Sequence, residues 1–208
     1  MVVLNRPVFR RARPGSEPER VPNGDPDLTR ALWREYGERD FVPVALRDRC
    51  PTPEMEATGL FQTWRLANGD SWASIGVYRA SKLMRTRVIV IPWYYRVAGP
   101  VFRAINPVVP LPRIPRPGGT IAYTFVYNHL AEGPRGLDLW RELLARANDL
   151  ALDDGADLLT AAFDPSDRFL PAFARGSLNR IDYRLGMRWI SGDPPPVGAY
   201  FVDPRDMA

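Results

Sequence analysis

The sequence has few of the side chains that build disulfides and metal sites. It contains one cysteine, Cys50, and one histidine, His129. A single cysteine cannot form a disulfide within the chain, and these two residues lack the number and spacing of zinc ligands. We therefore expect neither a disulfide scaffold nor a bound metal.

Long apolar runs are also missing. The first twenty residues, MVVLNRPVFRRARPGSEPER, lack the uninterrupted apolar core of a signal peptide. The most apolar later stretch, residues 88–112, is broken by Arg96, Arg103 and several prolines, which makes it a poor transmembrane helix. These features predict a cytoplasmic protein without membrane contact.

Lysine is nearly absent, so arginine carries the positive charge. Lys and Arg together number 28 against 24 Asp and Glu, for a net charge of +4, and Lys82 is the only lysine. Guanidinium groups make forked contacts with phosphate and carboxylate. This excess suits a phosphorylated ligand, but a nucleotide-biased genome is the simpler explanation.

The length of the chain suits one hydrophobic core. Its 208 residues are 45% hydrophobic and include six Trp, and no internal repeat is visible. A chain of this size forms one core, or one core with a small appendage. We expect a single domain over residues 1–208.

The first part of the chain predicts a strand and two helices. Residues 8–13 read as a first strand. Asp25 and Pro26 form a favourable helix start, and apolar residues at helical spacing then predict a helix to about residue 39. The residues on its apolar face are Leu28, Leu32 and Tyr36. A second, weaker helix is predicted over residues 46–58.

A block of strands follows. FQTWRL (61–66) and SWASIGVYR (71–79) flank Asn68-Gly69, and Asn-Gly between aromatic and β-branched runs predicts a hairpin. MRTRVIVIPW (84–93) is predicted as a third strand.

Residues 93–118 carry repeated prolines between positions 100 and 117. Such a segment does not fit the centre of a sheet. We predict an ordered insertion that lies as a flap over one sheet face, with its aromatic side chains packed inward. The alternative is a membrane- or nucleic-acid-binding surface, because aromatic and basic residues interleave between Trp93 and Arg103. We favour the flap, and so expect no nucleic-acid partner.

The last part of the chain alternates strands and helices. TIAYTFVYN (120–128) resumes the sheet, a helix runs from near Leu137 to Asp153, and ADLLTAAF (156–163) reads as a buried strand. A short helix is predicted within residues 164–177. Residues 181–190 and 198–204 are predicted to form a closing hairpin.

The turn EGPRG (132–136) joins the strand of residues 120–128 to the following helix. A Gly-containing turn at the positive end of a helix presents backbone amides that bind anions. Arg135 could add a forked contact to a phosphate. The turn is neither a nucleotide P-loop nor a Rossmann fingerprint. The alternative explanation is that Asp138 simply caps the helix.

The order of elements and several motifs resemble the GCN5-related N-acetyltransferases. The resemblance is closest to the carboxyl-terminal half of the plant hookless-type acetyltransferase-like proteins. It rests on DSWASIGVY, LPRIPRPGG, the EGPRG turn and the helix containing RANDLA. The resemblance implies an α/β (α+β) fold with a mixed, centrally splayed β-sheet, flanked by helices and carrying a Pro-rich insertion before the central strand.

The resemblance also implies a cosubstrate, acetyl-CoA. In the family, the backbone of the strand before the turn contacts the pantetheine arm, and the turn amides hold the pyrophosphate. The positions implied here are Val126, Tyr127, Asn128, Gly133, Arg135, Gly136, Leu137 and Asp138.

Three residues depart from the family pattern. Asp138 and Trp140 stand where the pattern has glycine or a small residue, and a carboxylate there repels pyrophosphate by roughly 0.3–1 kcal/mol. Phe173 stands where the family often has a tyrosine that protonates the departing thiolate. Phenylalanine cannot donate that proton.

Acetyl transfer to an amine needs a base, or water at a suitable pH, to remove a proton. His129 and Glu132 are the titratable candidates beside the turn. We expect an acyl-CoA-dependent N-acetyltransferase that acts on an amine acceptor, with a homodimer left open. The alternative is a non-catalytic module that binds CoA or a protein partner. A serine hydrolase is excluded, because no nucleophile elbow is present.

Overall fold

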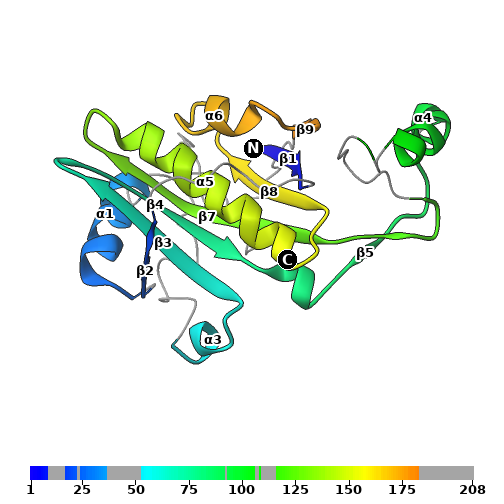
Figure 1. Ribbon diagram of the computed structural model, residues 1–208. Coiled ribbons are helices and arrows are strands. Elements are labelled where there is room, and N and C mark those ends of the chain that lie inside the picture. Colours follow the sequence, from blue (N-terminus) through cyan, green and yellow to red (C-terminus); the bar gives the residue numbers. More distant parts are fainter. Residues whose placement is uncertain are drawn as a thin grey trace, which may run out of the picture.

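The computed structural model describes residues 1–8, 17–22, 24–36, 53–91, 93–105, 108 and 116–182. Their centre is a seven-stranded sheet (Figure 1). In sheet order the strands are β2 (Glu19–Val21), β3 (Phe61–Asn68), β4 (Ser71–Tyr78), β7 (Tyr123–Glu132), β8 (Leu158–Phe163), β1 (Val2–Pro7) and β9 (Asn179–Asp182). Neighbouring strands are antiparallel, except that β7 and β8 are parallel. The mixed sheet expected from the sequence is confirmed.

Helix α1 (Pro26–Tyr36) begins as its sequence predicts. The Leu28 amide donates to Asp25 Oδ1 at 2.8 Å, which is the expected N-cap bond. Leu28, Leu32 and Tyr36 are buried on one face. Residues 37–39 of the predicted helix lie outside the described residues. Helix α3 (Pro53–Ala57) falls within the predicted second helix, whose residues 46–52 also lie outside the described part.

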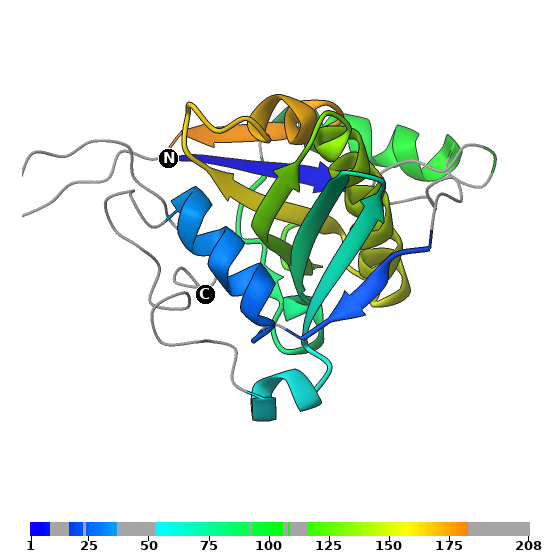
Figure 2. The same ribbon diagram turned by 90° about the vertical axis from the view of Figure 1, so that its left-hand side faces the viewer.

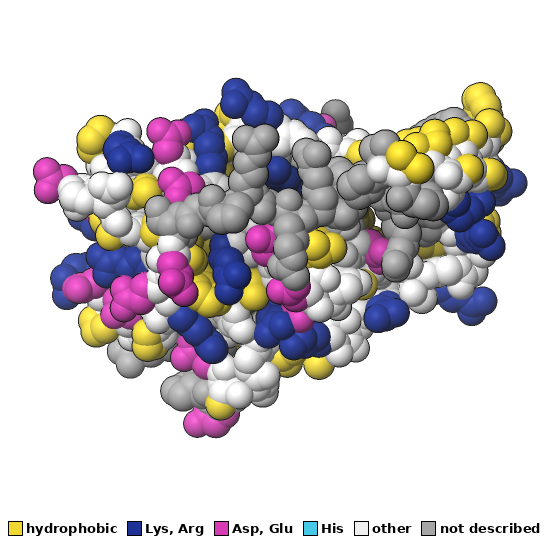
Figure 3. Space-filling model, in the orientation of Figure 1, with side chains coloured by type: hydrophobic (Ala, Val, Ile, Leu, Met, Phe, Trp, Pro, Cys, Tyr) yellow, Lys and Arg dark blue, Asp and Glu magenta, His cyan; other side chains and the backbone are white. Residues whose placement is uncertain are grey.

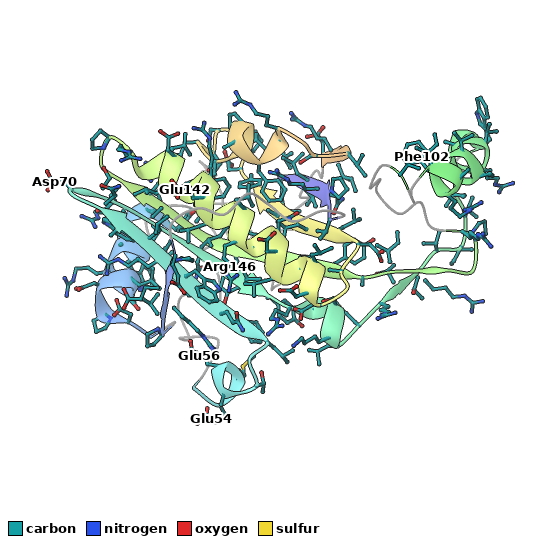
Figure 4. All side chains as sticks on the ribbon, in the orientation of Figure 1. Glu54, Glu56, Asp70, Phe102, Glu142 and Arg146 are labelled. Atoms are coloured by element: carbon teal, nitrogen blue, oxygen red, sulfur yellow. The ribbon has the colours of Figure 1, made fainter. Side chains whose placement is uncertain are left out.

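Strands β3 and β4 form the predicted hairpin. Asn68 pairs with Ser71 across the turn, and Gly69 has φ 58°, a left-handed conformation that glycine adopts at little cost. Asp70, labelled in Figure 4, lies at the tip of this hairpin.

Two helices cover one face of the sheet and α1 lies on the other (Figures 1 and 2). The first face carries α5 (Gly136–Asp153) and α6 (Leu170–Ala174). The apolar face of α5 packs into the main core through Leu139, Trp140, Leu143, Leu144, Ala147 and Ala151. Arg146, labelled in Figure 4, extends over the ring of Trp64 in β3.

Helix α5 ends at the glycine that its sequence indicates. Gly155 has φ 67°, and the Ala156 amide donates to Ala151 O while the Gly155 amide donates to Leu152 O. These two bonds are those of a Schellman motif. β8 then follows as the predicted buried strand, and α6 occupies part of the predicted short helix.

Two predicted strands differ from the structure, and a third lies mostly outside the described residues. The first strand is Val2–Pro7 rather than 8–13, and residues 9–13 lie outside the described residues. The predicted strand 84–93 does not join the main sheet, because both edges of β4 are taken by β3 and β7. In this segment β5 (Thr86–Arg87) pairs with β6 (Thr120–Ile121) in a separate two-stranded sheet. Of the closing hairpin, residues 183–190 and 198–204 are outside the described part, and β9 pairs with β1.

The Pro-rich insertion lies before the central strand β7, as expected, but its described residues do not cover a sheet face. After a 3-10 turn, η1 (Ala80–Lys82), and β5, the chain forms helix α4 (Trp93–Ile105), which stands away from the sheet in Figure 1. The first seven residues of this helix contain no proline, and Pro100 lies inside it. The expected flap over a sheet face is therefore wrong for the described residues. Of the aromatic side chains expected to pack inward, Trp93 is 75% exposed and Phe102 is half-buried.

Candidate functional site

The sheet opens at its centre, between β7 and β8. Their parallel pairing runs from Tyr123 with Leu158 to Val126 with Ala161 and stops there. β7 continues to Glu132 while still paired with β4, and β8 continues to Phe163. The two central strands therefore separate beyond Val126, which is the splay that the family resemblance implies.

A bulge in β7 lies at the opening. Tyr127 pairs with Gly76 and Leu130 with Ser74, so β7 has one more residue than β4 over this interval. Asn128 lies in the bulge with φ 48°, and Asn is among the few non-glycine residues that tolerate this conformation. The extra residue changes which backbone groups of β7 face β8.

Two carbonyls of β7 beyond the bulge are held by side chains. Tyr36 Oη donates to His129 O at 2.6 Å, and Arg168 Nη2 donates to Ala131 O at 2.8 Å. Arg168 also pairs with Glu35 of α1 at 3.0 Å. The opening is thus lined by α1 and by the segment after β8. From the sequence, Tyr36 was identified only as a buried helix residue, and Arg168 was not identified at all.

The turn after β7 packs against the β3–β4 hairpin. Gly133 has φ 78°, and a Cβ on it would lie 2.6 Å from Asp70 O and from Ser71 Oγ. The Arg135 amide donates to Ser71 Oγ at 3.1 Å. Glycine is therefore needed at position 133 for both conformation and close approach. Ser71 was not identified from the sequence as part of this turn.

Most amides of the turn are already hydrogen-bonded. The Gly136 amide donates to Gly133 O at 3.1 Å, and the Asp138 amide donates to Arg135 O at 3.0 Å. Among the described hydrogen bonds, none involves the amide of Leu137. This amide lies in the first turn of α5, where the positive end of the helix dipole favours an anion.

Asp138 and Arg135 are both exposed beside this helix end. Asp138 forms an ion pair with Arg141, and its side chain is 63% exposed. The N-cap residue of α5 is Arg135, and no side chain makes a cap hydrogen bond there. The alternative explanation that Asp138 caps α5 is therefore not supported.

His129 lies inside the protein rather than at its surface. Its ring stacks on Phe163 at a centroid distance of 4.9 Å and meets the ring of Trp140 edge-on at 5.6 Å. Its Nδ1 has no hydrogen-bond partner. Burial lowers the pKa of His129 from its ordinary value of 6.5 to about 3, so the ring is neutral at pH 7. A base of such low pKa is poorly matched to an amine.

Glu132 uses both carboxylate oxygens within the protein. Oε1 accepts from Arg34 at 2.7 Å and Oε2 from Trp72 Nε1 at 3.0 Å. These bonds tie α1 to the hairpin end of the sheet. Glu132 remains partly exposed, at 37% for its side chain, so it is the more accessible of the two predicted bases.

The two aromatic departures from the family pattern are core residues. Trp140 is fully buried on the inner side of α5. Phe173 packs on Phe163, with ring centroids 5.4 Å apart. Trp140 therefore belongs to the apolar face of the helix and not to the turn.

The described residues contain neither a metal cluster nor a membrane-spanning helix. No cluster of His, Cys, Asp and Glu within them could hold a metal ion. None of the described helices has the length and apolar character needed to cross a bilayer.

One curated protein shares significant similarity with the chain. Over 152 residues, 28% are identical to a protein of Arabidopsis thaliana named probable N-acetyltransferase HLS1. The alignment covers 66% of this chain and 38% of that relative, so the chain spans well under half of its length. No family model and no solved structure matches.

The fold and this similarity agree. The sheet is mixed and mostly antiparallel, it opens between two parallel central strands, and helices flank both faces. A turn and a long helix follow the first of these two strands. Together with the sequence similarity, this arrangement relates the chain to the GCN5-related N-acetyltransferases.

Proposed function

We propose that the chain is an acyl-CoA-dependent N-acetyltransferase that transfers an acetyl group from acetyl-CoA to an amine. One observation carries the proposal. The parallel strands β7 and β8 separate at the bulge of Asn128, and β7 leads directly into the turn at the positive end of α5. The name of the Arabidopsis relative supports the same class of reaction.

The residues at the turn fit a diphosphate in part. The Leu137 amide and the exposed Arg135 side chain are the donors that α5 and its turn offer to an anion. The amides of Gly136 and Asp138 already donate hydrogen bonds to carbonyls of the turn. We therefore assign phosphate binding chiefly to Leu137 and Arg135, with Gly133 and Gly136 shaping the turn.

We propose fewer contacts with the pantetheine arm than the three positions that the resemblance implies. Val126 pairs with Val77 on one side and Ala161 on the other, and Tyr127 pairs with Gly76. Asn128 follows the last residue of β7 that is in register with β8 by two positions, and it lies in the bulge of β7, where the backbone turns toward the opening. Of the three implied positions, we assign the backbone contact to Asn128.

The cosubstrate supplies the acetyl group as an activated thioester. The chain has to orient the amine and accept its proton as the new C–N bond forms and the C–S bond breaks. Glu132 is the accessible acceptor beside the turn, although Arg34 and Trp72 hold its carboxylate. His129, being buried with a low pKa, is assigned to the core.

The alternative function is a non-catalytic module that binds CoA or a protein partner. Phe173 cannot protonate a thiolate, and both predicted bases are engaged in the fold. The two functions differ in a direct assay. An enzyme releases free CoA thiol from acetyl-CoA when mixed amines are supplied, whereas the module binds CoA and releases none.

Two charge changes at the turn should move CoA binding in opposite directions. Asp138→Asn removes a carboxylate from the positive end of α5 and frees Arg141, so binding should tighten by about 0.3–1 kcal/mol, or roughly two- to fivefold. Arg135→Ala should weaken binding by more than this if its contact is forked. Titration calorimetry at low salt with CoA measures both.

Thermal melts show whether a change in CoA binding comes from a loss of protein stability. Neither residue is buried, so the thermal melts of both variants should match the wild type. Absence of CoA binding by the wild type and by Asp138→Asn would reject this site and, with it, the proposed reaction.

A further inference from the structure

Helix α4 presents a row of apolar side chains to solvent. Trp93, Val97, Val101 and Ile105 follow one another at every fourth position and are 75%, 65%, 54% and 43% exposed. Residues four apart lie on one side of a helix. The row therefore runs along the whole of α4, over about 20 Å at 1.5 Å per residue.

Exposed apolar residues also flank the helix. Ile89, Val90 and Val108 are 81%, 72% and 84% exposed. In Figure 3 hydrophobic side chains, drawn in yellow, gather over α4 and form an apolar cap. Soluble monomers rarely expose contiguous apolar patches beyond a few hundred Å², and larger ones mark interaction sites.

The charged residues of α4 and of the chain on either side of it are of one sign. From Ser71 to Ala131 the chain contains no Asp or Glu. Among the described residues of this stretch, the exposed basic side chains outside the ion pairs of Asp154 are Arg85, Arg87, Arg96, Arg103 and Arg116. Lys and Arg side chains lie beside and below the apolar cap in Figure 3. The patch therefore combines apolar surface with a cluster of positive charge.

The arginines of α4 lie away from the middle of the apolar row. Arg96 and Arg103 are seven residues apart, which puts them on nearly the same side of the helix, about 120–140° around the axis from the middle of the row. Long basic side chains at this position can reach outward while their stems cover apolar surface. An apolar row containing Trp on one side of a helix, with Arg on the other side, is the pattern of helices that lie in the interface of a membrane.

We propose that α4 and its flanking arginines bind the surface of an anionic membrane, with the apolar row of α4 lying among the lipid headgroups and the arginines contacting lipid phosphates and carboxylates. This is peripheral binding, in agreement with the lack of a spanning helix among the described residues. It replaces the expectation of no membrane contact. It stands independently of the acetyl-CoA site.

Two other binding partners match the exposed surface of α4 less well. A second copy of the chain would bring two clusters of arginine together, and like charges oppose such contact. A nucleic acid would use the arginines but would leave Val97, Val101 and Ile105 in water, since aliphatic side chains offer no stacking surface. An anionic membrane uses both the charge and the apolar row.

The test uses the full chain and two kinds of vesicle. One is phosphatidylcholine alone, and in the other about a third of the lipid is replaced by phosphatidylserine. Co-sedimentation should show binding to the anionic vesicles, weakened by salt. Each of Arg96→Ala and Arg103→Ala should reduce binding about fivefold. Val97→Ser with Val101→Ser should reduce it about tenfold or more, because serine keeps a similar helix propensity but loses the apolar surface.

The matched control is Leu178→Ser, which changes a side chain as exposed as Val101, at 55%, outside α4. It should bind anionic vesicles like the wild type. Equal binding to both vesicles, no binding to either, or equal loss in the control overturns the proposal. So does a dimer in sedimentation velocity that the Val97→Ser, Val101→Ser variant abolishes, which would assign the row to a second copy.

Discussion

Replacing Asp154 by Asn should lower the free energy of unfolding by about 3–5 kcal/mol. The Asp154 carboxylate is 4% exposed and accepts from both Nε and Nη2 of Arg79, and Lys82 Nζ lies 3.4 Å from its Oδ1. The pair joins the end of α5 to the end of β4. Removing the carboxylate leaves the guanidinium of Arg79, whose side chain is only 15% exposed, without the charge that compensates it, and that is the costly way to break an ion pair.

The measurement is urea unfolding, with a thermal melt as a second probe. At about 2–4 °C per kcal/mol for a chain of this length, the melting temperature should fall by about 6–20 °C. Asp138→Asn is the matched control, because it removes the same charge from an exposed pair with Arg141 and should cost about 0–1 kcal/mol. Equal losses in the two variants would show that the Arg79 pair contributes no more than a surface contact.

Features with strong local signals were predicted correctly from the sequence. The cap and apolar spacing of α1, the Asn68-Gly69 hairpin, the glycine that ends α5 and the buried strand β8 all depend on residues close together in the chain. The resemblance supplied what local patterns could not, namely a mixed sheet that is splayed at its centre, and the structure has this opening between the parallel strands β7 and β8. Together these gave the order of elements from residue 120 onward.

The errors concern placement in three dimensions. Residues 84–93 are rich in β-branched side chains, but no sequence pattern reveals that both edges of β4 are occupied. The prolines around α4 suggested a flap. The apolar residues at every fourth position of this segment, which are exposed in the structure, were nevertheless a sequence signal for one face of a helix. Tyr36 and Arg168 come from segments distant in the chain from the carbonyls that they bind, so their part in the opening could not be predicted.

His129 should make the protein less stable as the pH falls below about 6.5. Its pKa is about 3 in the folded state and near 6.5 when exposed on unfolding, so the unfolded state takes up the proton first. The contribution of neutral His129 to the free energy of unfolding is therefore fully present above pH 6.5. It is lost progressively as the pH falls toward 3. Between pH 7 and pH 5 the loss should be roughly 2 kcal/mol, at about 1.36 kcal/mol per pH unit below 6.5.

His129→Phe should remove most of this pH dependence. Phenylalanine keeps an aromatic ring against Phe163 and Trp140, cannot take up a proton and leaves the backbone carbonyl that Tyr36 binds. Urea unfolding of both proteins at several pH values from 7 to 5 measures the difference. His129 is the single histidine of the chain, and carboxylates titrate mainly below this range, so the assignment is direct. Equal slopes in wild type and variant would mean that His129 is accessible to protons in the folded state, and it would then again be a candidate for the base of acetyl transfer.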